Sequence, residues 1–203
     1  LRDAIPASAT NGDVGLLYNR IQWLRRKDRD QEAWKMLLDA PDEPDKLIDL
    51  EGWWEERRLN CRIALNSGHP RIAYDIAAKH GPISGDAYIE AEFLAGWIAL
   101  RFLAEPEKAL GHFQALRAAA KGSKHLALGE YWLGRTALAL GDNGSALVHF
   151  HAAAKYPQYF YGQLGRQALD AKPANLAVTP TPKPTEADIQ SFMSNDAVRA
   201  IGV

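Results

Sequence analysis

The sequence predicts an all-α protein, built as an α-superhelix (solenoid) of antiparallel helix hairpins. Three observations predict this class. Apolar residues recur at helical spacing over most of the chain, with few runs of β-branched residues. Glycine and proline stand at regular stops between the apolar segments. Small residues recur at matching positions about once every 36 residues, which is the period of a helix-hairpin repeat.

The expected helices follow in order along the chain. Their predicted ranges are 14–26, 30–39, 46–67, 70–80, 86–103, 106–120, 124–140, 143–155 and 158–170. The first two are short stretches of periodic apolar residues. The third stops at Gly68, and the fourth opens with Pro70, whose missing N–H is not needed in a first helical turn.

The fifth helix shows the clearest spacing, because Leu94, Trp97 and Ile98 stand at i, i+3 and i+4. The sixth begins at Pro106, by the same reasoning as Pro70. The seventh ends at Gly141, and Asp142 or Asn143 can cap the eighth. Pro157 separates the eighth from the ninth.

The three central hairpins align on a small residue in the first helix. The aligned positions are Cys61/Gly96/Gly134, then Ala64/Ala99/Ala137, then Ala73/Ala109/Ala146 after the turn, and Ala77/Phe113/Phe150 four residues later. Two helices approach closely where side chains are small, and larger side chains fill the space around that contact. We therefore expect Cys61 to be a buried packing residue rather than a reactive thiol.

The third hairpin resembles a tetratricopeptide repeat, with Gly134, Ala146, Phe150 and Pro157 near the expected offsets. A weaker, earlier unit starts at Ala33. A scaffold of this kind does not by itself name a function.

The sequence predicts three regions: an α-superhelical domain over 1–170, a proline-rich linker over 171–184, and the start of a following helical linker domain over 185–203. Thr185 is a plausible helix cap, with Asp188 three residues on. Because the chain begins with Leu1 and stops soon after a new element starts, we expect it to be cut from a longer protein.

Composition excludes several classes. Lys and Arg number 24 against 25 Asp and Glu, so no basic excess calls for nucleic acid. No apolar stretch approaches the roughly 20 residues that span a bilayer. A single cysteine excludes an internal disulfide, and no motif calls for a cofactor or a metal ion.

Four phrases together resemble the superhelical domain of the soluble lytic murein transglycosylases. They are WWEERRLNCRIAL (53–65), EAEFLAGWIALRFL (90–103), YWLGRTALALGD (131–142) and YFYGQLGRQAL (159–169). Residues 188–203 resemble the start of the linker domain that follows in that family. The resemblance covers about residues 12–203 and is best over 53–170.

The resemblance implies a periplasmic parent enzyme, a lyase that cleaves peptidoglycan without water in a downstream lysozyme-like domain. That domain carries a Glu-Ser motif and a Gly-Leu-Met-Gln signature, and neither occurs here. No catalytic residue can therefore be assigned, and we expect this chain alone to be inactive. Its expected partners are glycan strands and its own downstream catalytic domain.

For the other acidic, basic and histidine side chains, a structural role is favoured over a catalytic, metal-binding or ligand-binding one. Glu56, Glu90 and Glu92 are expected on solvated or ion-paired faces. His112 and His149 both precede a repeat phenylalanine, and two histidines do not make a zinc site. Arg57, Arg58, Arg101 and Arg135 could bind stem-peptide carboxylates, but salt bridges between helices are favoured.

Aromatic residues are the best functional clue, because sugars stack on aromatic rings. Trp97 and Trp132 stand at core spacing and are expected to pack. The candidate glycan contacts are Tyr156, Tyr159, Tyr161 and Arg135. The leading hypothesis is a non-catalytic scaffold that positions glycan strands and the catalytic domain. The alternative is a free-standing tetratricopeptide-like adaptor for a protein partner, and a catalytic domain of unfamiliar type is a third, weaker interpretation.

Overall fold

The computed structural model describes residues 12–41, 43, 46–47, 49–81, 83–170 and 183–200, and within them the chain is helical without a strand. The helices are α1 (Val14–Arg25), α2 (Asp30–Asp39), α3 (Leu50–Asn66), α4 (Pro70–Ala78), α5 (Gly85–Arg101), α6 (Pro106–Ala119), α7 (Ser123–Ala139), α8 (Asn143–Ala154), α9 (Phe160–Leu169), α10 (Glu186–Ser194) and α11 (Asp196–Ala200). The all-α class is confirmed, and α1 to α9 match the expected segments.

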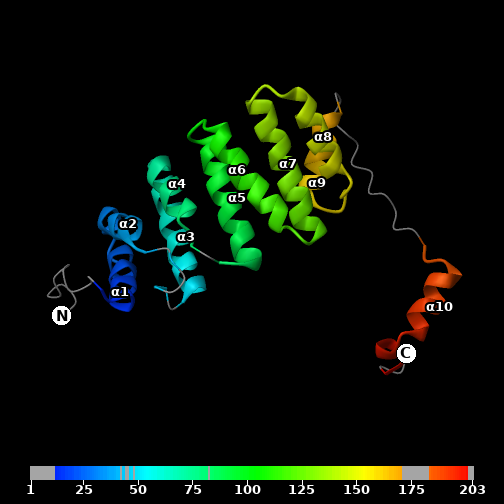
Figure 1. Cartoon of the computed structure of the whole chain (residues 1–203), viewed down its shortest axis with the longest axis horizontal. Helices are drawn as coiled ribbons and strands as arrows, with labels where there is room; N and C mark the ends of the chain where they lie inside the picture. The colour runs from blue at the N-terminus through cyan, green and yellow to red at the C-terminus, as the bar shows by residue number, and fades with distance from the viewer. Residues whose placement is uncertain are drawn as a thin grey trace.

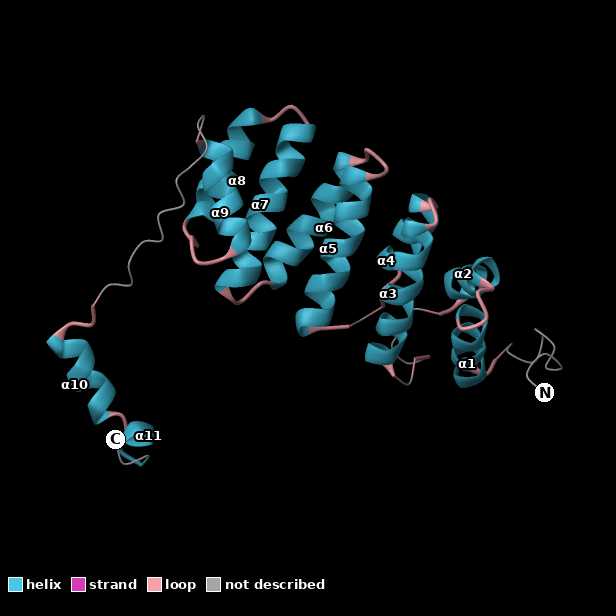
Figure 2. Ribbon diagram, turned by 180° about the vertical axis from the view of Figure 1, so that it is seen from behind, coloured by secondary structure: helices cyan, strands magenta, loops and turns pink. Residues whose placement is uncertain are grey.

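Helices α1 to α9 follow one another in chain order across the molecule (Figure 1), and the view from behind shows the same order (Figure 2). From α1 to α9 each helix packs against the next one in sequence, most extensively in α7–α8 and α5–α6. Helix α9 packs on both α7 and α8. The row is therefore built from contacts between sequence neighbours.

Local chemistry sets the helix ends. Asp49 accepts a hydrogen bond from the Gly52 amide at 2.9 Å, which starts α3 at Leu50 rather than at the expected residue 46. Asp142 caps α8 by accepting from the Ser145 amide at 2.9 Å. The predicted cap at Thr185 is confirmed as a reciprocal capping box with Asp188.

The recurring small residues lie at helix contacts, as the alignment predicted. Cys61 is fully buried. A Cβ added to Gly96 would come within 2.8 Å of the Phe113 ring, and one added to Gly134 within 2.6 Å of the Phe150 ring. In the α5–α6 and α7–α8 pairs, the phenylalanine of the second helix therefore packs directly on the glycine of the first.

The core divides into two hydrophobic clusters. One lies mainly between α1 and α5 and includes Trp34, Trp53, Trp54 and Cys61. The other lies mainly between α5 and α9 and includes Phe113 and Phe150 with several neighbours. The partly buried Tyr74 and Trp97 pack against both, so they join the two clusters.

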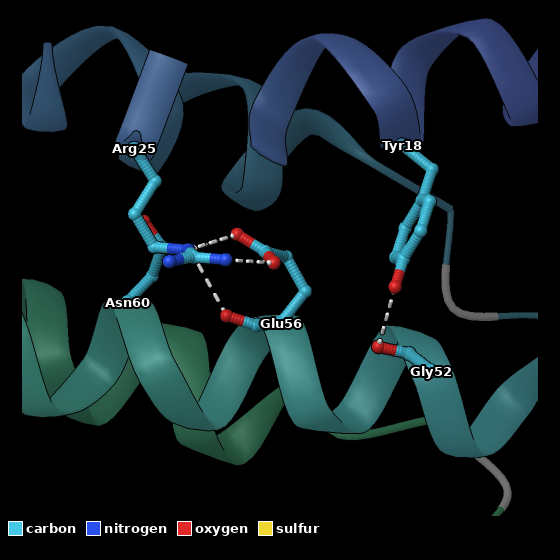
Figure 3. A network of polar contacts seen from close by, with 5 residues as sticks. All are labelled: Tyr18, Arg25, Gly52, Glu56 and Asn60. Atoms are coloured by element: carbon cyan, nitrogen blue, oxygen red, sulfur yellow. Dashed lines mark hydrogen bonds and ion pairs between the residues drawn. The ribbon is translucent and has the colours of Figure 1, made fainter. Parts of the chain in front are cut away.

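Buried carboxylates tie the helices together. Glu56 on α3 accepts hydrogen bonds from the Arg25 guanidinium of α1 at 2.6 and 2.9 Å and from the Asn60 amide at 2.9 Å (Figure 3). Tyr18 donates to the Gly52 carbonyl in the same interface. Because Glu56 is only 2% exposed, this pairing supplies the charge and hydrogen bonds that water no longer provides.

Residues 171–182 of the predicted linker lie outside the described residues, as do residues 201–203 of the predicted third region. Helices α10 and α11 pack against each other, and Ile189, Phe192 and Met193 of α10 are exposed. Among the described residues, no helix is both long and apolar enough to cross a membrane.

Candidate functional site

A cleft of about 450 Å³ opens across the first helices of successive pairs. Its lining residues are Arg62, Leu65, Asn66, Phe93, Leu94, Trp97, Trp132 and Tyr161. They come from α3, α5, α7 and α9. The volume lies in the range of small-molecule sites, which are mostly apolar and aromatic with a few polar groups. We call this site the aromatic cleft.

Helical spacing brings the lining residues to one side. Arg62 and Asn66 are one turn apart on α3, so their side chains share a face. Phe93 and Trp97 have the same i, i+4 relation on α5. Because α3 and α5 are in contact, these two faces meet at the cleft.

Three rings from three helices form its aromatic wall. The Phe93 and Trp132 ring centroids are 5.9 Å apart, those of Phe93 and Tyr161 are 6.5 Å apart, and those of Trp132 and Tyr161 are 6.4 Å apart. Behind them, Trp132 stacks on Phe113 with an interplanar angle of 22°. The wall is therefore anchored in the hydrophobic core, and its rings are held in fixed, tilted orientations.

The wall carries two polar groups, the Tyr161 hydroxyl and the Trp132 indole N–H. Burial is the largest influence on Tyr161 and raises the pKa of its hydroxyl, although the nearby Trp132 indole acts to lower it. Tyr161 is therefore neutral at physiological pH. The Trp132 Nε1 is buried, and no acceptor meets it with hydrogen-bond geometry among the described residues.

The α3 side of the cleft carries the charge. Arg58 donates to both Glu90 oxygens, at 3.1 and 3.4 Å, and Arg62 reaches one of them at 3.4 Å. Arg62 is 58% exposed and lines the cleft, whereas Arg58 is half-buried and does not line it. The expected salt bridge of Arg58 to a neighbouring helix is confirmed.

Of the four sequence-predicted contacts, the structure places Tyr161 in the cleft. Arg135 donates to the Tyr131 hydroxyl at 2.9 Å, and the Tyr131 ring lies 5.6 Å from that of Tyr161, so Arg135 reaches the wall only through Tyr131. Tyr156 and Tyr159 are half-buried at the turn before α9 and do not line the cleft.

Two carboxylates of the central helices are buried and paired with histidines. Glu92 is 7% exposed and bonds His112 at 2.7 Å and His80 at 3.2 Å. Glu130 is 9% exposed and bonds His149 at 2.8 Å, with Arg117 on its other oxygen. Glu92 was expected on a solvated or ion-paired face. It is paired but buried, because it links α5 to the residues that follow α4 and to α6.

The two repeat histidines and Arg57 have structural partners too. His112 and His149 occupy matching repeat positions, and each bonds the carboxylate of its own pair. Arg57 is fully buried and donates to the Leu37 and Pro41 carbonyls. Within the described ranges, no group of three or more His, Cys, Asp or Glu is arranged to hold a metal ion.

The sequence alone missed Arg62, Asn66 and Phe93 as lining residues. A signal was present in the repeat, because Arg62 and Trp97 each directly follow the small contact residue of their helix. That position faces the cleft on both α3 and α5. Trp97 and Trp132 were assigned to packing, and they both pack and line the cleft.

A second cleft, of about 430 Å³, lies between the α1–α2 turn and the α3–α4 turn. Its lining is mainly polar, and in it Arg29 is bonded to Glu32 at 2.6 and 2.7 Å. Trp34 supplies its main aromatic surface, in edge contact with His69. It lacks the converging rings of the aromatic cleft.

Comparisons with protein-family models, curated proteins and solved structures found no match to the chain. The fold and the aromatic cleft are the grounds on which a function can be argued.

Proposed function

We propose that the chain is the non-catalytic superhelical scaffold of a periplasmic lytic transglycosylase, and that it holds peptidoglycan glycan strands in the aromatic cleft. In this role the tetratricopeptide-like hairpins form a solenoid that positions both the strand and a downstream catalytic domain. The lining residues supply stacking surfaces and hydrogen-bond donors, which suit binding rather than acid–base chemistry.

One observation carries the proposal. The four phrases that resemble the transglycosylase superhelical domain lie on α3, α5, α7 and α9, and these four helices line the aromatic cleft. Their meeting at one cleft links the resemblance to a place where a sugar ring can stack.

The test is calorimetric titration of the purified chain with a β-1,4-linked N-acetylglucosamine tetrasaccharide. We expect binding to the native chain, and a loss of at least about tenfold for Trp97→Ala, which corresponds to about 1.4 kcal/mol. Trp23→Ala is the matched control, because Trp23 is also half-buried but lies on α1 outside the cleft. Equal affinity of both variants would contradict the proposed site.

The non-catalytic part has its own test. The chain is incubated with purified peptidoglycan, and soluble products are analysed by mass spectrometry. We expect no 1,6-anhydromuropeptides, and their release by this chain alone would overturn that part of the proposal.

A second candidate is a tetratricopeptide-like adaptor for a protein partner. It is favoured by exposed apolar side chains on α7, α8 and the turn between them, where Leu138, Leu140, Leu147 and Val148 are 39–66% exposed. The downstream coding sequence discriminates between the two candidates, since a Glu-Ser motif in a lysozyme-like domain there would favour the scaffold.

A further inference from the structure

The α3 end of the aromatic cleft has more positive than negative charge. Arg58 and Arg62 share the single carboxylate of Glu90, and Arg58 makes the shorter contact. Two guanidiniums against one carboxylate leave a net charge of about +1 at this end. Because Arg62 is 58% exposed and lines the cleft, its guanidinium is available to a ligand.

The polar groups around the cleft are rich in donors. Asn66 lies one turn beyond Arg62 and is exposed, so its amide faces the same side. The Tyr161 hydroxyl stands on the same wall, next to the buried Trp132 indole. None of the lining side chains is a carboxylate. A complementary ligand must therefore bring acceptors, and at the Arg62 end a negative charge.

We infer that the aromatic cleft selects a saccharide that carries a carboxylate, with a sugar face against the rings of Phe93, Trp97 and Trp132 and the carboxylate at Arg62. This inference rests on the proposed function and adds a ligand preference to it. The carboxylate can belong to the lactyl ether of a muramic acid residue or to an attached peptide, and both present the same planar acceptor to a guanidinium.

The experiment compares three tetrasaccharides by calorimetry: neutral N-acetylglucosamine only, alternating N-acetylglucosamine and N-acetylmuramic acid with free lactyl carboxylates, and the same sugar with stem peptides. We expect at least about fivefold tighter binding of a carboxylated ligand than of the neutral one at low salt. The preference should shrink at 1 M salt, where the screening length falls to about 3 Å. Comparison of the affinities for the free-lactyl and the peptide-bearing ligands identifies which of the two carboxylates binds at Arg62.

Arg62→Gln should remove most of that preference, measured as the ratio of carboxylated to neutral affinity within the same variant. Arg166→Gln is the matched control, because Arg166 is exposed on α9 and does not line the cleft. Thermal melts establish that both variants are folded, which is expected since Arg58 retains its contact with Glu90.

The outcomes separate the two proposals. Equal binding of neutral and carboxylated ligands to the native chain, or a preference that survives Arg62→Gln, overturns the inference and leaves the glycan site standing. Failure of all three ligands to bind overturns both.

Discussion

The two halves of the helical row pair their buried glutamates with different side chains. Each of α3, α5 and α7 buries a glutamate near its middle, and each glutamate links neighbouring helices. In the N-terminal half Glu56 is held by Arg25, a side chain that stays charged at any physiological pH. In the C-terminal half a histidine of the following helix bonds each of Glu92 and Glu130, and Arg117 of the preceding helix also pairs with Glu130.

The residues at the contact between the two helices of a pair also differ between the halves. The α3–α4 pair combines Cys61 with Ala77, whereas the next two pairs combine a glycine with a phenylalanine. The comparison teaches that each pair keeps a small residue at the helix contact and a buried glutamate with a hydrogen-bonding partner, although the individual residues change.

The largest effect should come from breaking the N-terminal ion pair. Arg25→Met leaves Glu56 buried at 2% exposure without its cation, at an expected cost of about 3–5 kcal/mol in the free energy of unfolding. Urea denaturation measures the loss. Arg71→Met, which breaks the more exposed pair with Glu105, is the control and should cost much less. Similar losses for the two variants would mean that burial of the pair is unimportant.

The glycine contact comes next in size. Gly134→Ala places a methyl group within 2.7 Å of the buried Phe150 ring and should destabilise the protein by about 1–3 kcal/mol. Gly111→Ala is the matched control within a helix, because nothing lies within 4 Å of its added Cβ. That change should stabilise the protein by about 0.5–1 kcal/mol through helix propensity. Opposite signs in thermal or urea denaturation are the expected result.

Acid should weaken the C-terminal half through Glu92. Burial alone would raise the pKa of Glu92, but hydrogen bonds from His112, His80 and Tyr88 outweigh it and lower the pKa to about 2 from the ordinary 4.5. A lowered pKa contributes stability above pH 4.5 that is lost as the pH falls toward 2.

The measurement compares native protein with Glu92→Gln by urea denaturation at pH 5 and pH 3. The stability advantage of the native protein should be largest at pH 5 and should narrow by about 1–2 kcal/mol at pH 3. An advantage that is constant or grows on acidification would show that the ionised Glu92 is not stabilised by its partners.

The smallest effect concerns Cys61. Its side chain is fully buried, and burial raises the pKa of the thiol to about 12, so little thiolate exists near neutral pH. We expect no labelling by a thiol reagent at pH 8 in the native protein and complete labelling in 6 M guanidinium chloride. Rapid labelling of the native protein would place Cys61 away from the α3–α4 contact.

The sequence predicted the helices and their contacts well because both depend on local patterns. Apolar spacing, Pro70, Pro106 and the cap at Asp142 act within a few residues of one another. The placement of Cys61 and Gly134 followed from the repeat, which reports packing without coordinates.

The sequence predicted the site poorly because the cleft depends on distant helices. Arg62 and Tyr161 are nearly 100 residues apart in sequence, and only the packing of successive first helices brings them to one cleft. The burial of Glu92 was missed for a similar reason, since the direction in which it points is decided by two histidines outside α5. Tyr161 was found because aromatic residues cluster locally around Pro157.

The most direct test of the central claim is an NMR titration that follows the indole N–H signals of the six tryptophans. Only Trp97 and Trp132 line the aromatic cleft, and Trp34 lines the second cleft. On addition of the N-acetylglucosamine tetrasaccharide, we expect the Trp97 and Trp132 signals to shift while those of Trp23, Trp34, Trp53 and Trp54 stay in place. A shift confined to Trp34, or none at all, would contradict the assignment of the aromatic cleft as the ligand site.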